Sequence, residues 1–209
     1  MKPMLLPVLL TLTLLGCAHS STNKTGKSGT EKPPCCRELK AGVAFAEGSI
    51  YQLESEWISD ADRKIRLGVL HGRPQVVAMF FASCEFACPI IVNDMKRLEA
   101  ALPEKVRANT DFLLVSFDPE RDSPAALRAF RTRMRLPTER WTLLRGEADD
   151  VRELAALLGV NYRKDARGQY AHSNLITVLN PNGEVVAQQS GLNQSPDELA
   201  RKITQLLAP

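Results

Sequence analysis

The chain has 209 residues, of which 44% are hydrophobic and 24% are charged. This composition fits one globular domain with its own core plus a short extra segment, and it excludes a collagen-like chain, a coiled-coil rod and a wholly disordered chain. The net charge of +3 is too small to indicate a nucleic-acid-binding surface, so we expect no nucleic-acid partner. Because the chain has only three histidines and five cysteines, any metal or redox site must draw on few residues.

The N-terminal segment is predicted to direct export. Residues 4–15 are nearly all apolar and follow Lys2. This run is too short to span a bilayer but suits a secretory signal, and no run of 18 apolar residues occurs anywhere in the sequence. It ends at Gly16-Cys17, which resembles a bacterial lipobox. The resemblance implies a signal peptide at 1–16, a lipid on the Cys17 sulfur, and a protein anchored to a bacterial membrane, inner or outer, facing the periplasm.

A tether at residues 17–47 is predicted to separate this anchor from a domain at 48–209. Residues 20–34 are small, polar or proline, with no large apolar side chain, so they cannot bury enough surface to fold. Outside the cytosol thiols tend to oxidise, so the remaining cysteines are structural disulfides, redox groups or metal ligands. For Cys35 and Cys36, a second soft-metal site, a redox partner and an accessory disulfide all remain open.

The pattern of the domain alternates between strands and helices. We expect a hairpin at its edge, strands buried on both faces where the apolar runs are continuous, and a turn at 180–183 where the sequence reads Asn-Pro-Asn-Gly. This order predicts a thioredoxin-like α/β fold, with a mixed central sheet flanked by helices and an N-terminal edge hairpin. The expected elements are the hairpin 49–57 and 64–70, the strands 75–82, 111–117, 141–144, 173–179 and 184–188, and the helices 91–102, 123–134, 147–158 and 195–206.

Two cysteines follow the first buried strand. Cys84 and Cys88 stand between the strand 75–82 and a helix, at the kind of strand end where open α/β sheets bind ligands. A helix N-terminus also favours a thiolate. We expect the two residues on one face of a helical turn, with Cα atoms roughly 6 Å apart. That spacing permits both a redox-active disulfide and a clamp for a soft metal ion.

His172 is expected at the same end of the sheet. It precedes the strand 173–179, which we expect to run antiparallel to the strand 75–82, so the start of one strand lies beside the end of the other. Two thiolates and one imidazole form a soft, three-coordinate ligand set. Structural zinc requires four ligands, and no fourth is evident, whereas Cu(I) accepts two or three. The ligand count therefore favours copper.

Four segments together resemble the Sco/SenC family of copper chaperones. They are Cys84-x-x-x-Cys88-Pro89, the segment 116–124 (Ser-Phe-Asp-Pro-Glu-Arg-Asp-Ser-Pro), the segment 170–173 (Tyr-Ala-His-Ser) and the turn 180–183. The resemblance implies a thioredoxin-like fold, copper as Cu(I) or Cu(II) on Cys84, Cys88 and His172, and a role in cytochrome c oxidase assembly. The implied partners are the copper-site subunit of the oxidase and a copper donor protein.

The sequence departs from the family pattern beside the histidine. Ala171 stands where the family usually has an aspartate that would orient the imidazole, and Ser123 stands where threonine is frequent. For Asp118 and Asp122, near the site in family members, a metal-linked role and a role in capping loops and helix ends both remain open. His19 and His71 are expected at the surface.

Two functions remain open. In the first, the protein carries copper to the dinuclear CuA centre of the oxidase and is not an enzyme. In the second, Cys84 and Cys88 are a redox pair that reduces the cysteines of the target site by thiol–disulfide exchange. His172 favours the carrier, because a plain reductase does not need it. A peroxiredoxin-type peroxidase is disfavoured, because the threonine that normally lies three residues before its cysteine is replaced by Phe81 or Glu85 here.

Overall fold

The structure is a computed structural model that describes residues 44–166, 168 and 170–208. In this part of the chain no helix is long and apolar enough to cross a membrane. Several predictions from the sequence lie outside the described residues and stay predictions: the signal peptide 1–16, the tether 17–47 up to residue 43, the lipid site Cys17, His19, and the pair Cys35 and Cys36.

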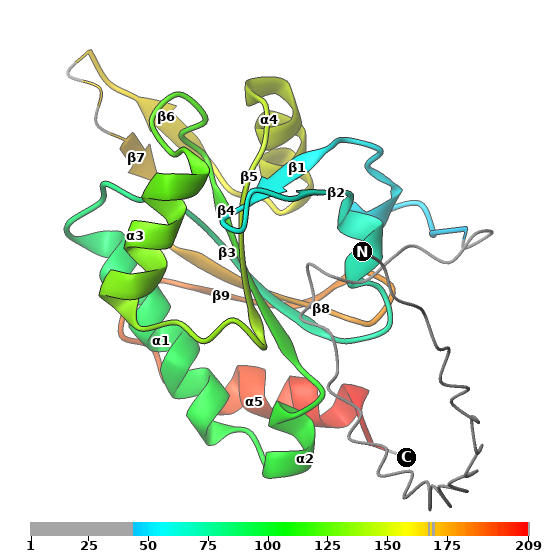
Figure 1. Cartoon of the computed structure of the whole chain (residues 1–209). Helices are drawn as coiled ribbons and strands as arrows, with labels where there is room; N and C mark the ends of the chain where they lie inside the picture. The colour runs from blue at the N-terminus through cyan, green and yellow to red at the C-terminus, as the bar shows by residue number, and fades with distance from the viewer. Residues whose placement is uncertain (1–43, 167, 169, 209) are drawn as a thin grey trace, which may run out of the picture. The chain divides into compact units, whose positions relative to one another are not determined.

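A seven-stranded mixed sheet forms the centre of the domain, in the order β2-β1-β5-β4-β3-β8-β9 (Figure 1). Strands β3, β4 and β5 are parallel, and β8 pairs antiparallel with β3, as the sequence predicts. The strands are β1 (Trp57–Ser59), β2 (Lys64–Ile65), β3 (Gln75–Phe80), β4 (Asp111–Ser116), β5 (Trp141–Arg145), β8 (Leu175–Leu179) and β9 (Val185–Ser190).

Helices cover both faces of this sheet. The helices α1, α3 and α5 lie on one face and α4 on the other (Figure 1). Ser123 followed by proline is typical of a helix start, and Ser123 indeed caps α3 by accepting a hydrogen bond from the Ala126 N–H at 3.2 Å. The sequence Ser-Pro-Asp-Glu at 195–198 predicts a capping box at the start of α5, but this prediction is wrong: Pro196 is the N-cap, and the Ser195 hydroxyl bonds the Asp197 carboxylate instead. The helices are α1 (Ala87–Ala101), α2 (Glu104–Arg107), α3 (Pro124–Met134), α4 (Ala148–Leu157) and α5 (Asp197–Leu206).

The predicted edge hairpin exists but is much shorter than expected. Only Trp57–Ser59 pairs with Lys64–Ile65. The flanking segments Ile50–Gln52 and Leu67–Leu70 are 3-10 helices, and both place buried side chains in the core. Over three or four residues, the apolar spacing of a buried 3-10 turn cannot be told apart from the period-two alternation of a strand. This is why both segments were predicted as strands.

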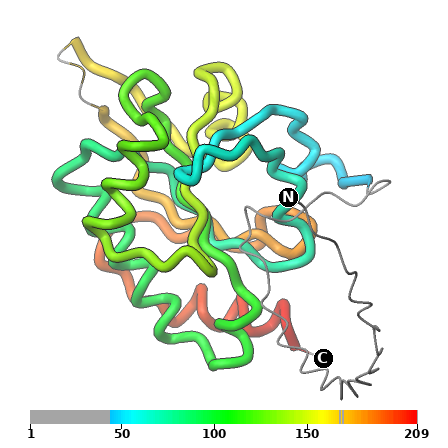
Figure 2. The backbone as a smooth tube through the Cα atoms, viewed as in Figure 1, coloured from blue at the N-terminus to red at the C-terminus, as the bar shows by residue number. Residues whose placement is uncertain are grey.

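A second, two-stranded sheet was not predicted. It pairs β6 (Tyr162–Lys164) with β7 (Tyr170–His172), and it shares no ladder with the main sheet. We call it the histidine ribbon. Figure 2 shows the ribbon and the loop that joins β3 to α1 at the same end of the domain. The ribbon brings His172 to the end of the sheet where the cysteines lie.

The two central strands give this end of the domain a rigid base. Every residue of β3 and β4 is buried, as the continuous apolar runs predict. On β3, the Phe80 ring packs against Phe130 of α3 at 4.6 Å between centroids. On β4, the Phe112 ring stacks on Trp141 at 4.7 Å. Close packing of this kind resists displacement, so the loop after β3 starts from a fixed point.

Candidate metal centre

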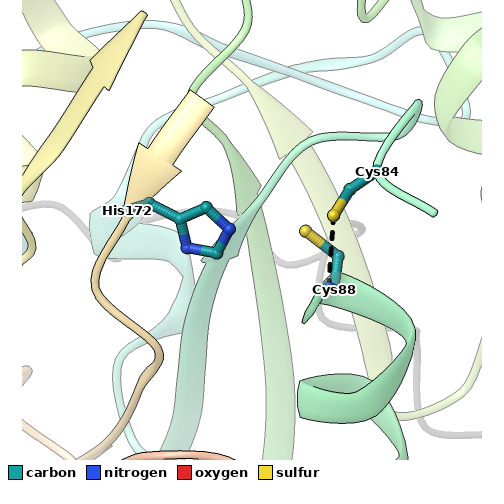
Figure 3. Close-up of side chains that lie close together, drawn as sticks. All are labelled: Cys84, Cys88 and His172. Atoms are coloured by element: carbon teal, nitrogen blue, oxygen red, sulfur yellow. Dashed lines mark hydrogen bonds between the residues drawn. The ribbon is translucent and has the colours of Figure 1, made fainter. Parts of the chain in front are cut away.

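The two cysteines lie on either side of the start of α1. After β3 the chain turns, and the Cys84 N–H donates to the Phe81 carbonyl at 3.1 Å. Cys84 is therefore in the loop, whereas Cys88 lies in the first turn of α1. The prediction that both share a helical turn is wrong for Cys84. Its Sγ nevertheless accepts a hydrogen bond from the Cys88 N–H at 3.3 Å, so an N–H group at the helix N-terminus faces the sulfur (Figure 3).

The three side chains singled out in the sequence come together here. One ligand atom from each of Cys84, Cys88 and His172 lies within 4.8 Å of the others. The imidazole reaches toward the two sulfurs from the histidine ribbon (Figure 3). Cys84 is 7% exposed, Cys88 is fully buried, and neither forms a disulfide. This arrangement provides two soft sulfur ligands and one nitrogen ligand for a single metal ion.

The cysteines have opposite protonation tendencies. The hydrogen bond from the Cys88 side chain is the main cause that lowers the pKa of Cys84 to about 3, and His172 contributes in the same direction. The pKa of Cys88 is raised, because its thiol donates to Cys84 and because it is buried. Burial lowers the pKa of His172, but its hydrogen bonds to Cys84 and Ser173 raise it, and the net shift is upward. Without a metal ion, Cys84 therefore favours the thiolate and Cys88 the thiol.

A backbone carbonyl orients the imidazole. The Nδ1 atom of His172 lies 3.0 Å from the Ser173 carbonyl oxygen. A carbonyl can only accept, so Nδ1 carries a proton in this bond, and Nε2 is the nitrogen that faces the Cys84 thiolate and that, once deprotonated, can bind a metal. Ala171 is exposed, so it plays no part in this orientation. The Ser173 carbonyl thus does here what the family's aspartate is expected to do.

Aromatic rings surround the histidine and hold the ribbon against the domain. The His172 ring lies 5.0 Å from Phe117 and 6.1 Å from Phe81, measured between centroids. Tyr162 stacks on Phe117 at 5.2 Å, and the Tyr170 ring packs at a tilt against Phe81 at 5.3 Å. Because the ribbon has no ladder to the main sheet, these contacts fix its position.

A cavity of about 500 Å³ opens onto Cys84 and His172. Its wall combines aromatic rings with polar groups of both charges. A ligand or an incoming sulfur atom can reach the two residues through this cavity. The lining residues are Phe81, Ser83, Cys84, Glu85, Phe86, Ala87, Arg121, Tyr170 and His172.

Asp122 fastens the cysteine loop to the sheet. Its buried carboxylate accepts hydrogen bonds from the Ala82 N–H at 2.7 Å and from the Ser116 hydroxyl at 2.6 Å. The Arg133 guanidinium donates to the Ala82 carbonyl at 2.7 Å, so both backbone groups of Ala82 are held by side chains. Burial is the main cause that raises the pKa of Asp122. Asp122 lies outside the ligand cluster, and these contacts support its structural role.

Asp118 anchors the histidine ribbon, as Asp122 anchors the cysteine loop. It is fully buried, pairs with Arg121, and accepts a hydrogen bond from the Tyr170 hydroxyl at 3.3 Å. Tyr170 lies two residues before His172 in β7. The segment 116–124 therefore holds both halves of the centre, the loop through Asp122 and the ribbon through Asp118. His71, in contrast, lies away from the centre and contacts Asn182 at 3.3 Å.

Replacing Asp122 with alanine is expected to destabilise the domain by about 3 kcal/mol. The change leaves the Ala82 N–H and the Ser116 hydroxyl buried without their charged acceptor, and each such loss costs on the order of 1–3 kcal/mol. Urea unfolding followed by circular dichroism measures the effect. Glu153→Ala removes an exposed carboxylate from α4 and is the control, expected within about 0.5 kcal/mol of the parent. Equal unfolding midpoints for the two variants would contradict the anchoring role of Asp122.

The fold and the centre define a class of thioredoxin-like proteins that carry a cysteine pair and a histidine at one end of the sheet. The profile of the SCO1/SenC family matches residues 47–208, and the chain belongs to this family. A protein of Stutzerimonas stutzeri named "Putative copper-binding protein" is 27% identical over 143 residues, which are 66% of this chain and 68% of that protein.

Two solved structures share the fold. Bradyrhizobium japonicum ScoI with copper bound is 20% identical with a TM-score of 0.61, over 73% of this chain and 97% of that one. BsSco, described as having a disulfide switch and as a member of the Sco family of cytochrome c oxidase assembly proteins, is 23% identical. Its TM-score is 0.62, over 75% of this chain and 93% of BsSco.

Proposed function

We propose that this protein is a copper carrier that binds copper through Cys84, Cys88 and His172 and delivers it to the CuA centre of cytochrome c oxidase. The observation that carries the proposal is the approach of the three ligand atoms to within 4.8 Å of one another. Two thiolates and an imidazole suit Cu(I), and among the described residues no fourth histidine, cysteine or carboxylate joins this group. The copper-binding relative and the copper-bound family member support the choice of metal.

The residues of the centre have distinct tasks in loading and release. Cys84 is already a thiolate and is the first ligand to bind, whereas Cys88 must lose its proton before it binds. Nε2 of His172 completes the set, oriented by the Ser173 carbonyl. Copper, as the cargo, leaves when thiolates of the acceptor enter the cavity and replace these ligands one at a time.

We further propose that the protein works outside the cytosol on a lipid anchor. The lipobox-like segment that ends at Cys17 and the polar stretch 20–34 support a domain tethered to a bacterial membrane and facing the periplasm. There the copper-site subunit of the oxidase and a copper donor protein are its partners.

An anaerobic Cu(I) competition titration tests the proposed ligand set. A soluble form of residues 44–209 is expected to bind one equivalent, and His172→Ala is expected to bind about a hundredfold more weakly. The estimate follows from roughly 10–16 kcal/mol for four ligands of a structural zinc site, or about 3 kcal/mol per ligand. Affinity that is indifferent to His172 would remove it from the centre, and His71→Ala, remote from the cysteines, is the control.

A thiol–disulfide oxidoreductase is the second candidate, favoured by the thiolate and thiol in contact. The Cys84 thiolate would attack a target disulfide and release one target thiolate. The Cys88 sulfur, once deprotonated, would then attack Cys84 and release the second. Two electrons pass to the target, and a Cys84–Cys88 disulfide remains. The disulfide switch named for BsSco supports this candidate. Reduction of an oxidised CuA domain at equal rates by the parent and by His172→Ala would favour it over the carrier.

A further inference from the structure

Phe86 has an unusual position for an aromatic side chain. It is 85% exposed, whereas the other exposed large hydrophobic residues among those described, Leu157, Val185 and Val186, are 37–40% exposed. A single exposed apolar side chain is common on protein surfaces and by itself indicates nothing. Phe86, however, stands between Cys84 and Cys88, immediately before α1. Its exposed ring therefore lies beside the candidate metal centre.

The approach to the cysteines passes over this ring. Cys84 is 7% exposed and Cys88 is fully buried, so an incoming sulfur atom must enter through the 500 Å³ cavity. Phe86 belongs to the wall of that cavity. Any protein that brings a thiolate to Cys84 must therefore cover Phe86, and covering it removes a large apolar surface from water.

The charges around the cavity do not offer an alternative basis for docking. Arg121 is paired with the buried Asp118, and Lys164 is paired with Glu120. These opposite charges neutralise one another, and the exposed Glu85 on the same rim adds a single negative charge, so the net field that could attract a charged partner is small. Of the groups on this rim, the exposed Phe86 ring would therefore contribute most to binding another protein, because contact removes its apolar surface from water.

We propose that Phe86 is the anchor by which the copper-receiving protein docks, through an apolar surface that borders its own metal-binding cysteines. The inference rests on the proposed function and adds the kind of surface that the partner must present. An aromatic residue at the centre of an interface, surrounded by contacts that exclude water, is the usual location of concentrated binding energy. Because apolar contact dominates, docking depends only weakly on ionic strength.

The test compares transfer to a protein with transfer to a small chelator. The copper-loaded protein is mixed with the copper-free CuA domain of the bacterium's oxidase, and separately with bathocuproine disulfonate. Phe86→Ser is expected to lower the rate constant for transfer to the domain about thirtyfold, the loss typical of a hot spot. Transfer to the chelator is expected to stay unchanged. Phe86→Leu, which keeps an apolar side chain, should retain most of the rate, and Leu157→Ser is the control for an exposed apolar residue elsewhere.

Direct binding separates this inference from the proposed function. Calorimetric titration of the CuA domain with the copper-free protein should show about thirtyfold weaker binding for Phe86→Ser. If the parent binds the domain but passes no copper, delivery fails and the docking inference stands. Equal binding of the parent and the variant, or no binding by either, overturns the inference. Faster loss of copper to the chelator from Phe86→Ser also overturns it, because the ring would then be a cover for the metal.

Discussion

Oxidation of Cys84 and Cys88 to a disulfide is expected to lower the affinity of the protein for Cu(I) by about 10,000-fold. A disulfide removes two thiolate ligands at once and leaves only His172. At about 3 kcal/mol per ligand, the loss is about 6 kcal/mol, which corresponds to roughly four powers of ten. Reduction restores the thiols, so the loss is expected to be fully reversible. The redox state of the pair would thereby decide whether copper is bound.

The measurement is a Cu(I) competition titration carried out at fixed ratios of reduced to oxidised dithiothreitol. Copper occupancy should follow the fraction of reduced protein, determined in parallel by thiol labelling. Cys84→Ser is a matched variant that cannot form the disulfide; it should bind weakly at every ratio and show no redox dependence. Copper affinity that survives oxidation of the parent would show that the cysteines are not the ligands, and the carrier proposal would then fail.

The second large effect is expected in the pH dependence of Cys84 reactivity when no copper is bound. Cys84 should react with iodoacetamide at nearly the same rate at pH 5 as at pH 8. Its pKa is lowered to about 3 from an ordinary 9.0, chiefly by the hydrogen bond from Cys88, so the thiolate persists at both pH values. An ordinary thiol at pH 5 is ionised to about one part in ten thousand, and its rate falls about a thousandfold over this interval. A depressed pKa lowers intrinsic nucleophilicity, so the rate at pH 8 itself should be moderate.

Mass spectrometry of the 44–209 form measures this rate, because Cys84 and Cys88 are the cysteines that it contains. Labelling is expected to fall only as the pH approaches 3, which is the direction required by a lowered pKa. Cys88→Ala removes the donor to Cys84 and should restore a decline of about tenfold per pH unit below neutrality. The same decline in the parent would show that Cys84 is protonated at pH 5 and that Cys88 does not stabilise its thiolate.

The main sheet was predictable because its strands are unambiguous. The runs at Gln75–Phe80 and Asp111–Ser116 are buried at every position, and neither the length nor the composition of these segments suits a helix. The antiparallel placement of Leu175–Leu179 then brought His172 to the cysteines by topology alone. Both inferences depend on the order and direction of the strands in the sheet. A few continuous apolar segments are enough to determine them.

The histidine ribbon was not predictable by the same means. Tyr162–Lys164 has two exposed basic residues in three, so it lacks an apolar alternation. Its stability comes from rings that contact Phe117 and Phe81, which lie far away in the sequence. The local signal of a hairpin was the pair Asp165 and Gly168, turn-forming residues between the segments that begin at Tyr162 and Tyr170. The anchoring roles of Asp118 and Asp122 also depend on such distant contacts, so the sequence left them open.

The separate ladder of the histidine ribbon has a consequence for how such proteins diverge. Two ligands belong to the loop and helix that continue the main sheet, and the third belongs to a small module that is attached through side chains. Substitutions in that module can therefore accumulate without breaking a strand of the seven-stranded sheet. A lineage could lose the histidine and become a dithiol reductant, or regain it and become a metal carrier, while the same scaffold persisted throughout.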